Sequence, residues 1–157
     1  MLEYKEISIY FDINKKLIGV PCGKASQFGE DGVASLDIFF ELTHSYTDDE
    51  LEEFIGKVFD ACYSKEYFKN EMTAIEKYTK KKGYATAVKG YQCMVIRFYQ
   101  GEYTFVPMKI DRKYKGAFEG IKGISMKVSL YNKYIPVETG ALAIAFRKTM
   151  EVIMEQE

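Results

Sequence analysis

The chain has 157 residues and a net charge of −1, with 47% hydrophobic and 29% charged residues. This length and composition fit one folded domain over residues 1–157 and exclude a disordered chain. The overall charge favours neither a nucleic-acid binder nor an acidic mimic, but its distribution is uneven. Residues 1–63 contain five lysines and thirteen carboxylates, and the remainder of the chain is net positive. We therefore expect opposed charged faces on one domain.

Three widely separated cysteines and a single histidine exclude the common metal and redox motifs. Cys22, Cys62 and Cys93 form no CxxC pair, and His44 is the lone histidine. We therefore predict reduced thiols, no metal site and no cofactor. No basic-then-apolar leader follows Met1, and no run of about 18 apolar residues occurs. These features predict a cytoplasmic protein without a membrane partner.

The N-terminal part of the chain has the pattern of strands. Alternating apolar residues predict a strand over Glu3–Asp12. A shorter strand, Leu17–Val20, follows a turn and is expected to end at Pro21 and Gly23. A polar loop comes next, and strand character returns over Leu36–Leu42.

The clearest local signal predicts a helix after Thr47. Thr47 and Glu50 have the spacing of a capping box, and Tyr46 and Leu51 that of a hydrophobic staple. Apolar residues then recur at helical spacing as one buried stripe, formed by Leu51, Phe54, Ile55, Val58, Phe59 and Cys62. Carboxylates crowd the first two turns, where they favour the positive end of the helix dipole. These are Asp48, Asp49, Glu52 and Glu53.

Further elements are predicted along the rest of the chain. A second helix is expected within Ser64–Lys82, and alternation over Tyr91–Ile110 predicts a β-hairpin that turns at Gln100-Gly101. Pro107 indicates that the returning strand lies at an edge or ends there. A glycine-rich basic loop, Arg112–Gly123, precedes a strand over Ser125–Tyr131.

The chain should finish with a helix from about Pro136, in which Gly140 suggests close packing against another backbone. The elements together predict an α+β fold. We expect a mostly antiparallel sheet of about five to six strands, with two to three helices packed on it, including the C-terminal helix.

No residue pattern supplies a catalytic set. His44 has no motif partner, and the acidic run of the first helix is explained by a helix N-terminus without a metal. The glycines of the basic loop precede a strand, whereas a phosphate-binding loop leads into a helix. The sequence therefore predicts a binding protein and not an enzyme. An enzyme with a dispersed site would need a large apolar pocket with convergent polar groups.

A lysine and tyrosine cluster leaves one alternative open. Lys80, Lys81 and Lys82 lie between Tyr78 and Tyr91, with Tyr84 close by, and basic residues interleaved with aromatics suit single-stranded nucleic acid. Lysines at a helix end are also ordinary helix-terminal chemistry, which disfavours this alternative.

The C-terminal half resembles the core of immunity proteins from bacterial contact-dependent growth inhibition systems. The resemblance covers roughly residues 83–150. It rests on Gly83-Tyr84-x-Thr86, Cys93-x-Val95, Thr104-x-x-Pro107, Val128-x-Leu130 and the segment Pro136-x-Glu138-x-Gly140-Ala141-x-Ala143 with Arg147. Membership of that family implies a bacterial protein that binds the toxin domain of a delivered effector, commonly a nuclease, and blocks it.

Contact residues in that family vary with the toxin, so the resemblance assigns none. Charge complementarity suggests them instead, because a nuclease cleft that holds phosphates is basic and is commonly filled by carboxylates. We therefore predict a toxin-binding surface formed by Asp48, Asp49, Glu52 and Glu53. The basic loop is the next candidate.

Overall fold

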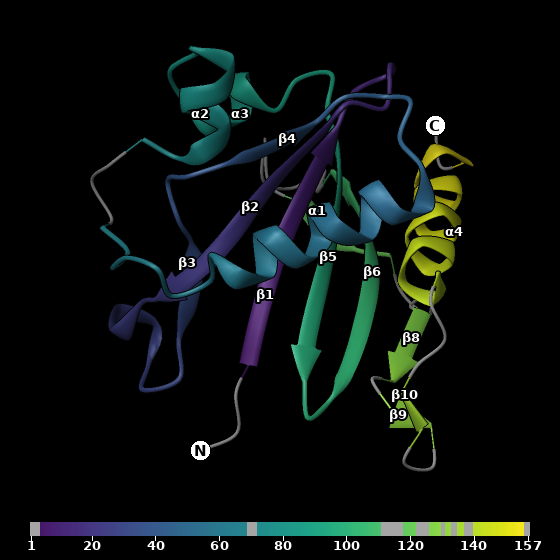
Figure 1. Cartoon of the computed structure of the whole chain (residues 1–157). Helices are drawn as coiled ribbons and strands as arrows, with labels where there is room; N and C mark the ends of the chain where they lie inside the picture. The colour runs from purple at the N-terminus through teal and green to yellow at the C-terminus, as the bar shows by residue number, and fades with distance from the viewer. Residues whose placement is uncertain are drawn as a thin grey trace.

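The computed structural model describes residues 4–68, 72–110, 118–121, 126–129, 131–132, 135–136 and 140–155. Within them the chain forms an antiparallel sheet with helices on both faces (Figure 1). The strands are β1 (Tyr4–Phe11), β2 (Leu17–Lys24), β3 (Val33–Ser35), β4 (Phe40–Leu42), β5 (Gln92–Tyr99), β6 (Glu102–Ile110), β7 (Phe118–Gly120), β8 (Met126–Ser129), β9 (Tyr131–Asn132) and β10 (Ile135–Pro136). The helices are α1 (Asp48–Asp60), α2 (Ala74–Thr79), α3 (Tyr84–Ala87) and α4 (Ala141–Glu155), with a 3-10 turn at Ser26–Phe28.

The main sheet has six positions, in the order β3-β2-β1-β5-β6-β7. Strand β4 also pairs with β2 and shares the position of β3, and β8 pairs with β6 and shares the position of β7. Strands β9 and β10 form a separate pair. This arrangement confirms the predicted α+β fold with an antiparallel sheet and a C-terminal helix.

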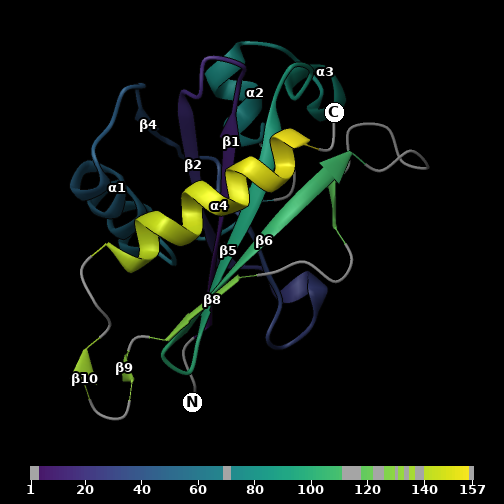
Figure 2. The same cartoon turned by 90° about the vertical axis from the view of Figure 1, so that its right-hand side faces the viewer.

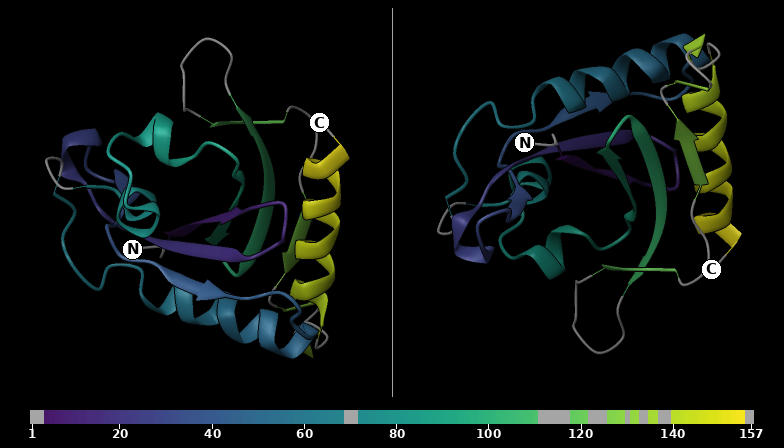
Figure 3. Two further views of the ribbon diagram at one scale, coloured as in Figure 1. Left: turned by 90° about the horizontal axis from the view of Figure 1, so that it is seen from above. Right: turned by 90° about the horizontal axis from the view of Figure 1, so that it is seen from below.

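The sheet is bent, and its two faces carry different helices. Helices α1 and α4 lie outside the bend along two different walls, whereas α2 and α3 lie inside it (Figures 2 and 3). Alternation along β1 divides its side chains between the two cores. Ile7, Ile9 and Phe11 are buried with α1 and α4, and Tyr10 is buried with α2 and α3.

The hairpin turn follows the sequence closely. Tyr99 pairs with Glu102, and the two residues between them, Gln100 and Gly101, have φ of 51° and 76°. Positive φ at both central positions is what a type I′ turn requires, and its twist matches that of the flanking strands. The predicted hairpin and its turn are confirmed.

Two prolines lie inside longer strands, which corrects the expectations that β2 ends at Pro21 and Gly23 and that Pro107 marks an edge or an end. Strand β2 pairs with β4 up to Gly19 and with β3 from Cys22, so Pro21 falls in the gap between these partners. Pro107 falls in the equivalent gap on β6, between its pairings with β8 and β7.

The backbone direction explains why each proline is tolerated. The Pro21 carbonyl accepts from Leu36 N–H at 2.9 Å, and the Pro107 carbonyl accepts from Ile121 N–H at 2.9 Å. Since N and C=O of one strand residue face the same side, each proline nitrogen faces the outer gap and not the central ladder. The missing N–H groups therefore interrupt no central pairing.

The third predicted strand and the second predicted helix are also corrected. Only Phe40–Leu42 of the predicted strand is extended and paired, as β4. In the described part of 64–82, the expected helix is a single short one, α2, which ends at Thr79 and is followed by Lys80 with a left-handed φ of 60°. Its start was visible in the sequence, because Thr73 and Glu76 form a second capping box.

The C-terminal helix begins later than expected, at Ala141, because Pro136 belongs to strand β10 and pairs with Tyr131 of β9. Gly140 precedes the helix with a φ of 94°, and a Cβ there would meet nothing within 4 Å. Its conformation, and not close packing, explains this glycine. The strand expected over 125–131 contains β8, and most of the basic loop 112–123 lies outside the described residues.

Close packing does require a glycine under α1. A Cβ at Gly19 in β2 would lie 2.5 Å from Val58 Cγ2 and 2.9 Å from Phe54 Cζ. The absence of a side chain lets α1 approach the backbone of β2, which sets the position of the acidic helix on the sheet.

Candidate functional site

The N-terminus of α1 is fixed by the predicted capping box. Thr47 Oγ1 accepts from Glu50 N–H at 3.1 Å, and Glu50 Oε1 accepts from Thr47 N–H at 3.1 Å. Tyr46 and Leu51 are both buried in the same core, as the predicted staple requires. These contacts fix the position of the first turn of α1.

The helical period divides the acidic residues of α1 into two sets. Residues four apart lie on the same face, so Asp48 and Glu52 share the side next to α4. Gly140 N–H donates to Glu52 Oε1 and Ala143 N–H donates to Glu52 Oε2, each at 3.1 Å. Glu52 thus binds unpaired backbone donors at the N-terminus of α4 and places a negative charge at its positive end.

Asp48 makes a second link to α4. Arg147 Nε donates to Asp48 Oδ1 at 2.9 Å, and its Nη2 donates to the Tyr46 carbonyl at 3.0 Å. The guanidinium also lies over the Tyr46 ring, 5.4 Å from its centroid. Two of the four predicted binding residues therefore join α1 to α4.

The other two acidic residues face outward. Glu53 forms an i,i+4 pair with Lys57 at 3.6 Å, and its side chain is 71% exposed. Asp49 is exposed, and among the described residues it has no hydrogen bond or ion pair. Both carboxylates are therefore accessible to a partner, and their binding role stays a prediction.

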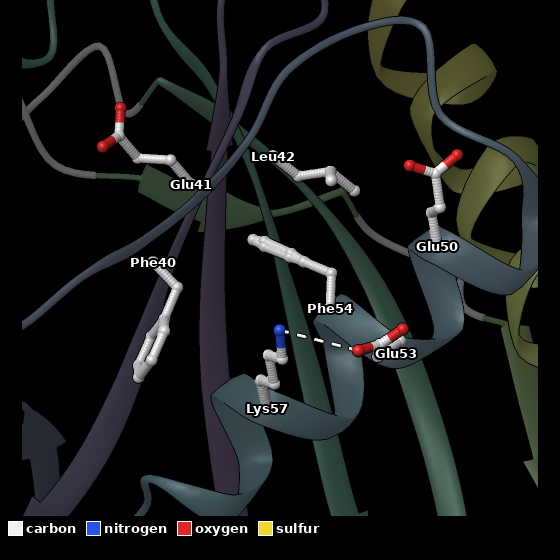
Figure 4. Close-up of a pocket in the computed structure, with 7 residues that line it drawn as sticks. All are labelled: Phe40, Glu41, Leu42, Glu50, Glu53, Phe54 and Lys57. Carbon is white, nitrogen blue, oxygen red and sulfur yellow. Dashed lines mark ion pairs between the residues drawn. The ribbon is translucent and has the colours of Figure 1, made fainter.

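A groove runs beside these residues, between β4 and α1 (Figure 4). Its volume is about 270 Å³, and its lining consists of Phe40, Glu41, Leu42, Glu50, Glu53, Phe54 and Lys57. Leu42 and Phe54 lie between the strand and the helix, whereas the Glu41 carboxylate points away from α1 (Figure 4) and pairs with Lys16 at 2.8 Å. Sequence reasoning missed this groove because β4 and α1 meet only in the folded chain.

The tyrosine rings of the lysine and tyrosine cluster pack against other parts of the fold. Tyr78 packs on Phe39 with ring centroids 5.4 Å apart, and the hydroxyls of Tyr84 and Tyr10 are 2.7 Å apart. Tyr91 packs against the same core. The three rings are partly buried in these contacts, which disfavours their use as a stacking platform for bases.

Glu76 holds the two short helices of this region together. Its carboxylate accepts from Thr73 N–H at 3.1 Å and from Gly83 N–H at 2.9 Å. Burial acts to raise the pKa of Glu76, but the hydrogen bonds from Gly83 and Thr73 outweigh it and lower that pKa below its usual value. The carboxylate is therefore a structural part of the α2–α3 unit.

All three cysteines are free and buried, and two of them, Cys22 and Cys62, share the backbone of Glu6 as hydrogen-bond partner. Glu6 N–H donates to Cys22 Sγ at 3.4 Å, and the Cys62 thiol donates to the Glu6 carbonyl at 3.7 Å. Interaction with the Cys62 thiol lowers the pKa of Cys22 although burial opposes this, and the same interaction raises the pKa of Cys62. The pair connects β2 to the end of α1.

The lone histidine lies three residues before the cap of the acidic helix. His44 is exposed and packs edge-on against Tyr46, with centroids 5.4 Å apart. In the described part of the chain, no three His, Cys, Asp or Glu side chains are grouped to hold a metal ion. None of the helices in the described ranges has the length and apolarity needed to cross a bilayer.

Comparison with known proteins finds similarity in fold but not in sequence. No family model and no curated protein matches this chain. Among solved structures, the Neisseria meningitidis protein of unknown function NMB0488 is similar, with a TM-score of 0.63 and 14% identity over 93% of this chain and 95% of that one. A chain of the CdiA-CT/CdiI toxin and immunity complex from Yersinia pseudotuberculosis is also similar, with a TM-score of 0.58 and 13% identity over 94% of this chain and 99% of that one.

Proposed function

We propose that this chain binds and neutralises a toxin domain of a contact-dependent growth inhibition effector, without catalysis of its own. The observation that carries the proposal is the likeness in fold to a chain of a toxin and immunity complex, which covers 94% of this chain and 99% of that chain. The residue pattern of segment 83–150 leads to the same expectation.

The proposed interface is the acidic N-terminal part of α1. Asp49 and Glu53 are exposed and would contact the toxin directly. Asp48 and Glu52 are bound to α4, so they would keep the helix in place and add negative potential. Carboxylates on a rigid helix suit a nuclease toxin, whose phosphate-binding cleft is basic.

Co-expression tests the function. The C-terminal domain of the effector encoded next to this gene should arrest growth alone and should be harmless with this protein. The purified pair should form a one-to-one complex. Absence of a toxic domain in the neighbouring gene, or undiminished toxicity on co-expression, would refute the proposal.

Charge reversal tests the interface. The double variant D49K/E53K should slow association with the toxin domain and weaken its salt dependence, because exposed interface charges act mainly on the association rate. The matched control is E151K/E155K, which reverses two exposed carboxylates at the same i,i+4 spacing on α4. Equal association rates for the two double variants would place the interface elsewhere.

Single-stranded nucleic-acid binding remains the alternative function, and it predicts an affinity that falls steeply with salt. The packing of Tyr78, Tyr84 and Tyr91 disfavours it. A titration with RNA and DNA oligonucleotides at low salt distinguishes the two functions.

A further inference from the structure

We propose that the groove between β4 and α1 receives the partner, and that its occupant is a protein segment with an apolar side chain flanked by arginine or lysine. This inference rests on the proposed function and names the chemistry of the surface that the toxin presents. It adds an apolar contact, made by Phe40 and Leu42 of β4 together with Phe54 of α1, to the acidic contact made by α1.

The floor of the groove is apolar and open. Phe40 and Leu42 are alternate residues of β4 and therefore lie on one face of that strand, opposite Glu41. Both pack on the main core but remain only partly buried, and Phe54 beside them is 5% exposed. An apolar floor of this kind gains free energy when a partner covers it, and such anchors dominate binding at protein interfaces.

The rim of the groove is acidic. Glu50 and Glu53 stand on the helix side, and Lys57 pairs with Glu53 at 3.6 Å (Figure 4). Over its length α1 carries six carboxylates, at positions 48, 49, 50, 52, 53 and 60, and one lysine. A purely apolar or acidic occupant would remove water from these carboxylates without compensation, which is costly. A cationic side chain beside the apolar anchor satisfies both parts of the groove.

The size and rigidity of the groove favour a protein segment. Its volume of about 270 Å³ lies just below the range of about 300–1,000 Å³ that is typical of small-molecule sites. It therefore suits one or two side chains that protrude from a larger surface. The capping box and the contact of Glu52 with α4 fix the helix wall before binding, so little ordering is needed when the partner arrives.

Two single variants separate the apolar and the acidic contribution. Leu42→Ala shortens the floor, and Glu53→Lys reverses one rim charge without touching the capping box. The matched controls are on α4: Ile144→Ala truncates an apolar side chain that is 53% exposed, and Glu151→Lys makes the same charge reversal on an exposed residue. The circular-dichroism spectrum and melting temperature of every variant are recorded first, so that loss of fold is not mistaken for loss of binding.

Binding is measured by calorimetry and stopped-flow mixing with the C-terminal domain of the effector encoded by the neighbouring gene. We expect Leu42→Ala to weaken the affinity about tenfold or more, mainly through faster dissociation. Glu53→Lys should mainly slow association, and both controls should match the wild-type protein. If the wild-type protein binds and all four variants bind equally, the groove is not the contact and this inference is overturned. If the wild-type protein itself does not bind, the proposed function fails.

Discussion

The carboxylate of Glu52 offers the sharpest test of how this fold is held together. Its two oxygens accept from Gly140 N–H and Ala143 N–H, each at 3.1 Å, across 88 and 91 residues of sequence. Glu52→Ala removes both hydrogen bonds and the negative charge at the start of α4. The variant should therefore loosen the N-terminal turn of the C-terminal helix and its junction with α1.

The magnitude follows from the two effects together. Loss of an N-terminal cap costs about 0.5–2 kcal/mol, and loss of a charge at the helix N-terminus costs about 0.3–1 kcal/mol. We expect Glu52→Ala to lower the free energy of unfolding by about 2 kcal/mol. Glu52→Gln keeps one carbonyl oxygen as acceptor but loses the charge, so it should cost about 1 kcal/mol. For a domain of this size, 2 kcal/mol corresponds to a fall of about 4–8 °C in melting temperature.

Urea unfolding followed by circular dichroism measures these differences. The control is Glu53→Ala, which removes a carboxylate one residue away whose contact is an exposed i,i+4 pair with Lys57. Such pairs contribute about 0.3–0.5 kcal/mol. If Glu52→Ala and Glu53→Ala lose the same stability, the contact between Glu52 and α4 contributes nothing and the reasoning is wrong.

Three further predictions concern glycine packing, a structural carboxylate and the thiol pair. Gly19→Ala should destabilise the protein by about 1–3 kcal/mol because its Cβ would overlap side chains of α1. Gly56→Ala, with open space around the new Cβ, should stabilise the protein by about 0.5–1 kcal/mol. Equal changes in the free energy of unfolding, measured by urea titration, would contradict the packing argument. The lowered pKa of Glu76 means that its contribution to stability is present above the unfolded-state pKa and is lost as pH falls through the folded-state pKa. Glu76→Gln should therefore destabilise at neutral pH, and its difference from wild type should shrink as pH is lowered below the unfolded-state pKa; a difference that stays constant over this acid range would refute this. Diamide accepts the two electrons and two protons that are released when two thiols form a disulfide. It should link Cys22 to Cys62, with a mass loss of about 2 Da and a cross-linked peptide. A different linkage, or no linkage in the folded protein, would show that the two sulfurs do not meet.

Local signals decided much of the secondary structure. The capping box at Thr47 and Glu50 and the apolar stripe after it predict α1, since every interaction they need lies within a few residues. Alternation predicts β1 and the hairpin, and the Gln100-Gly101 turn needs only the φ preferences of its own residues. The capping box of Thr73 and Glu76 is an equally local signal, and it places the start of α2 at Ala74, well inside the helix expected over 64–82.

Local signals failed where distant segments supplied the partners. Pro21 and Pro107 predict strand breaks when read alone, yet each lies in a gap between two outer strands and leaves the central ladder intact. Pro136 predicts the first turn of a helix, but it pairs with Tyr131 instead. A backbone N–H that is missing costs stability only if a partner faces it, and the sequence does not say which partner that is.

The candidate surface shows the same division. A capped, acidic, amphipathic helix with its carboxylates near one end is already evident from the residues of that segment. The folded chain assigns the carboxylates their roles: Asp48 and Glu52 bind α4, Asp49 and Glu53 face outward, and β4 forms the other wall of a groove. Helix capping and amphipathicity act over three or four residues, whereas the contacts that distinguish one carboxylate from another join residues up to 99 positions apart, and their pairing cannot be read from a local segment.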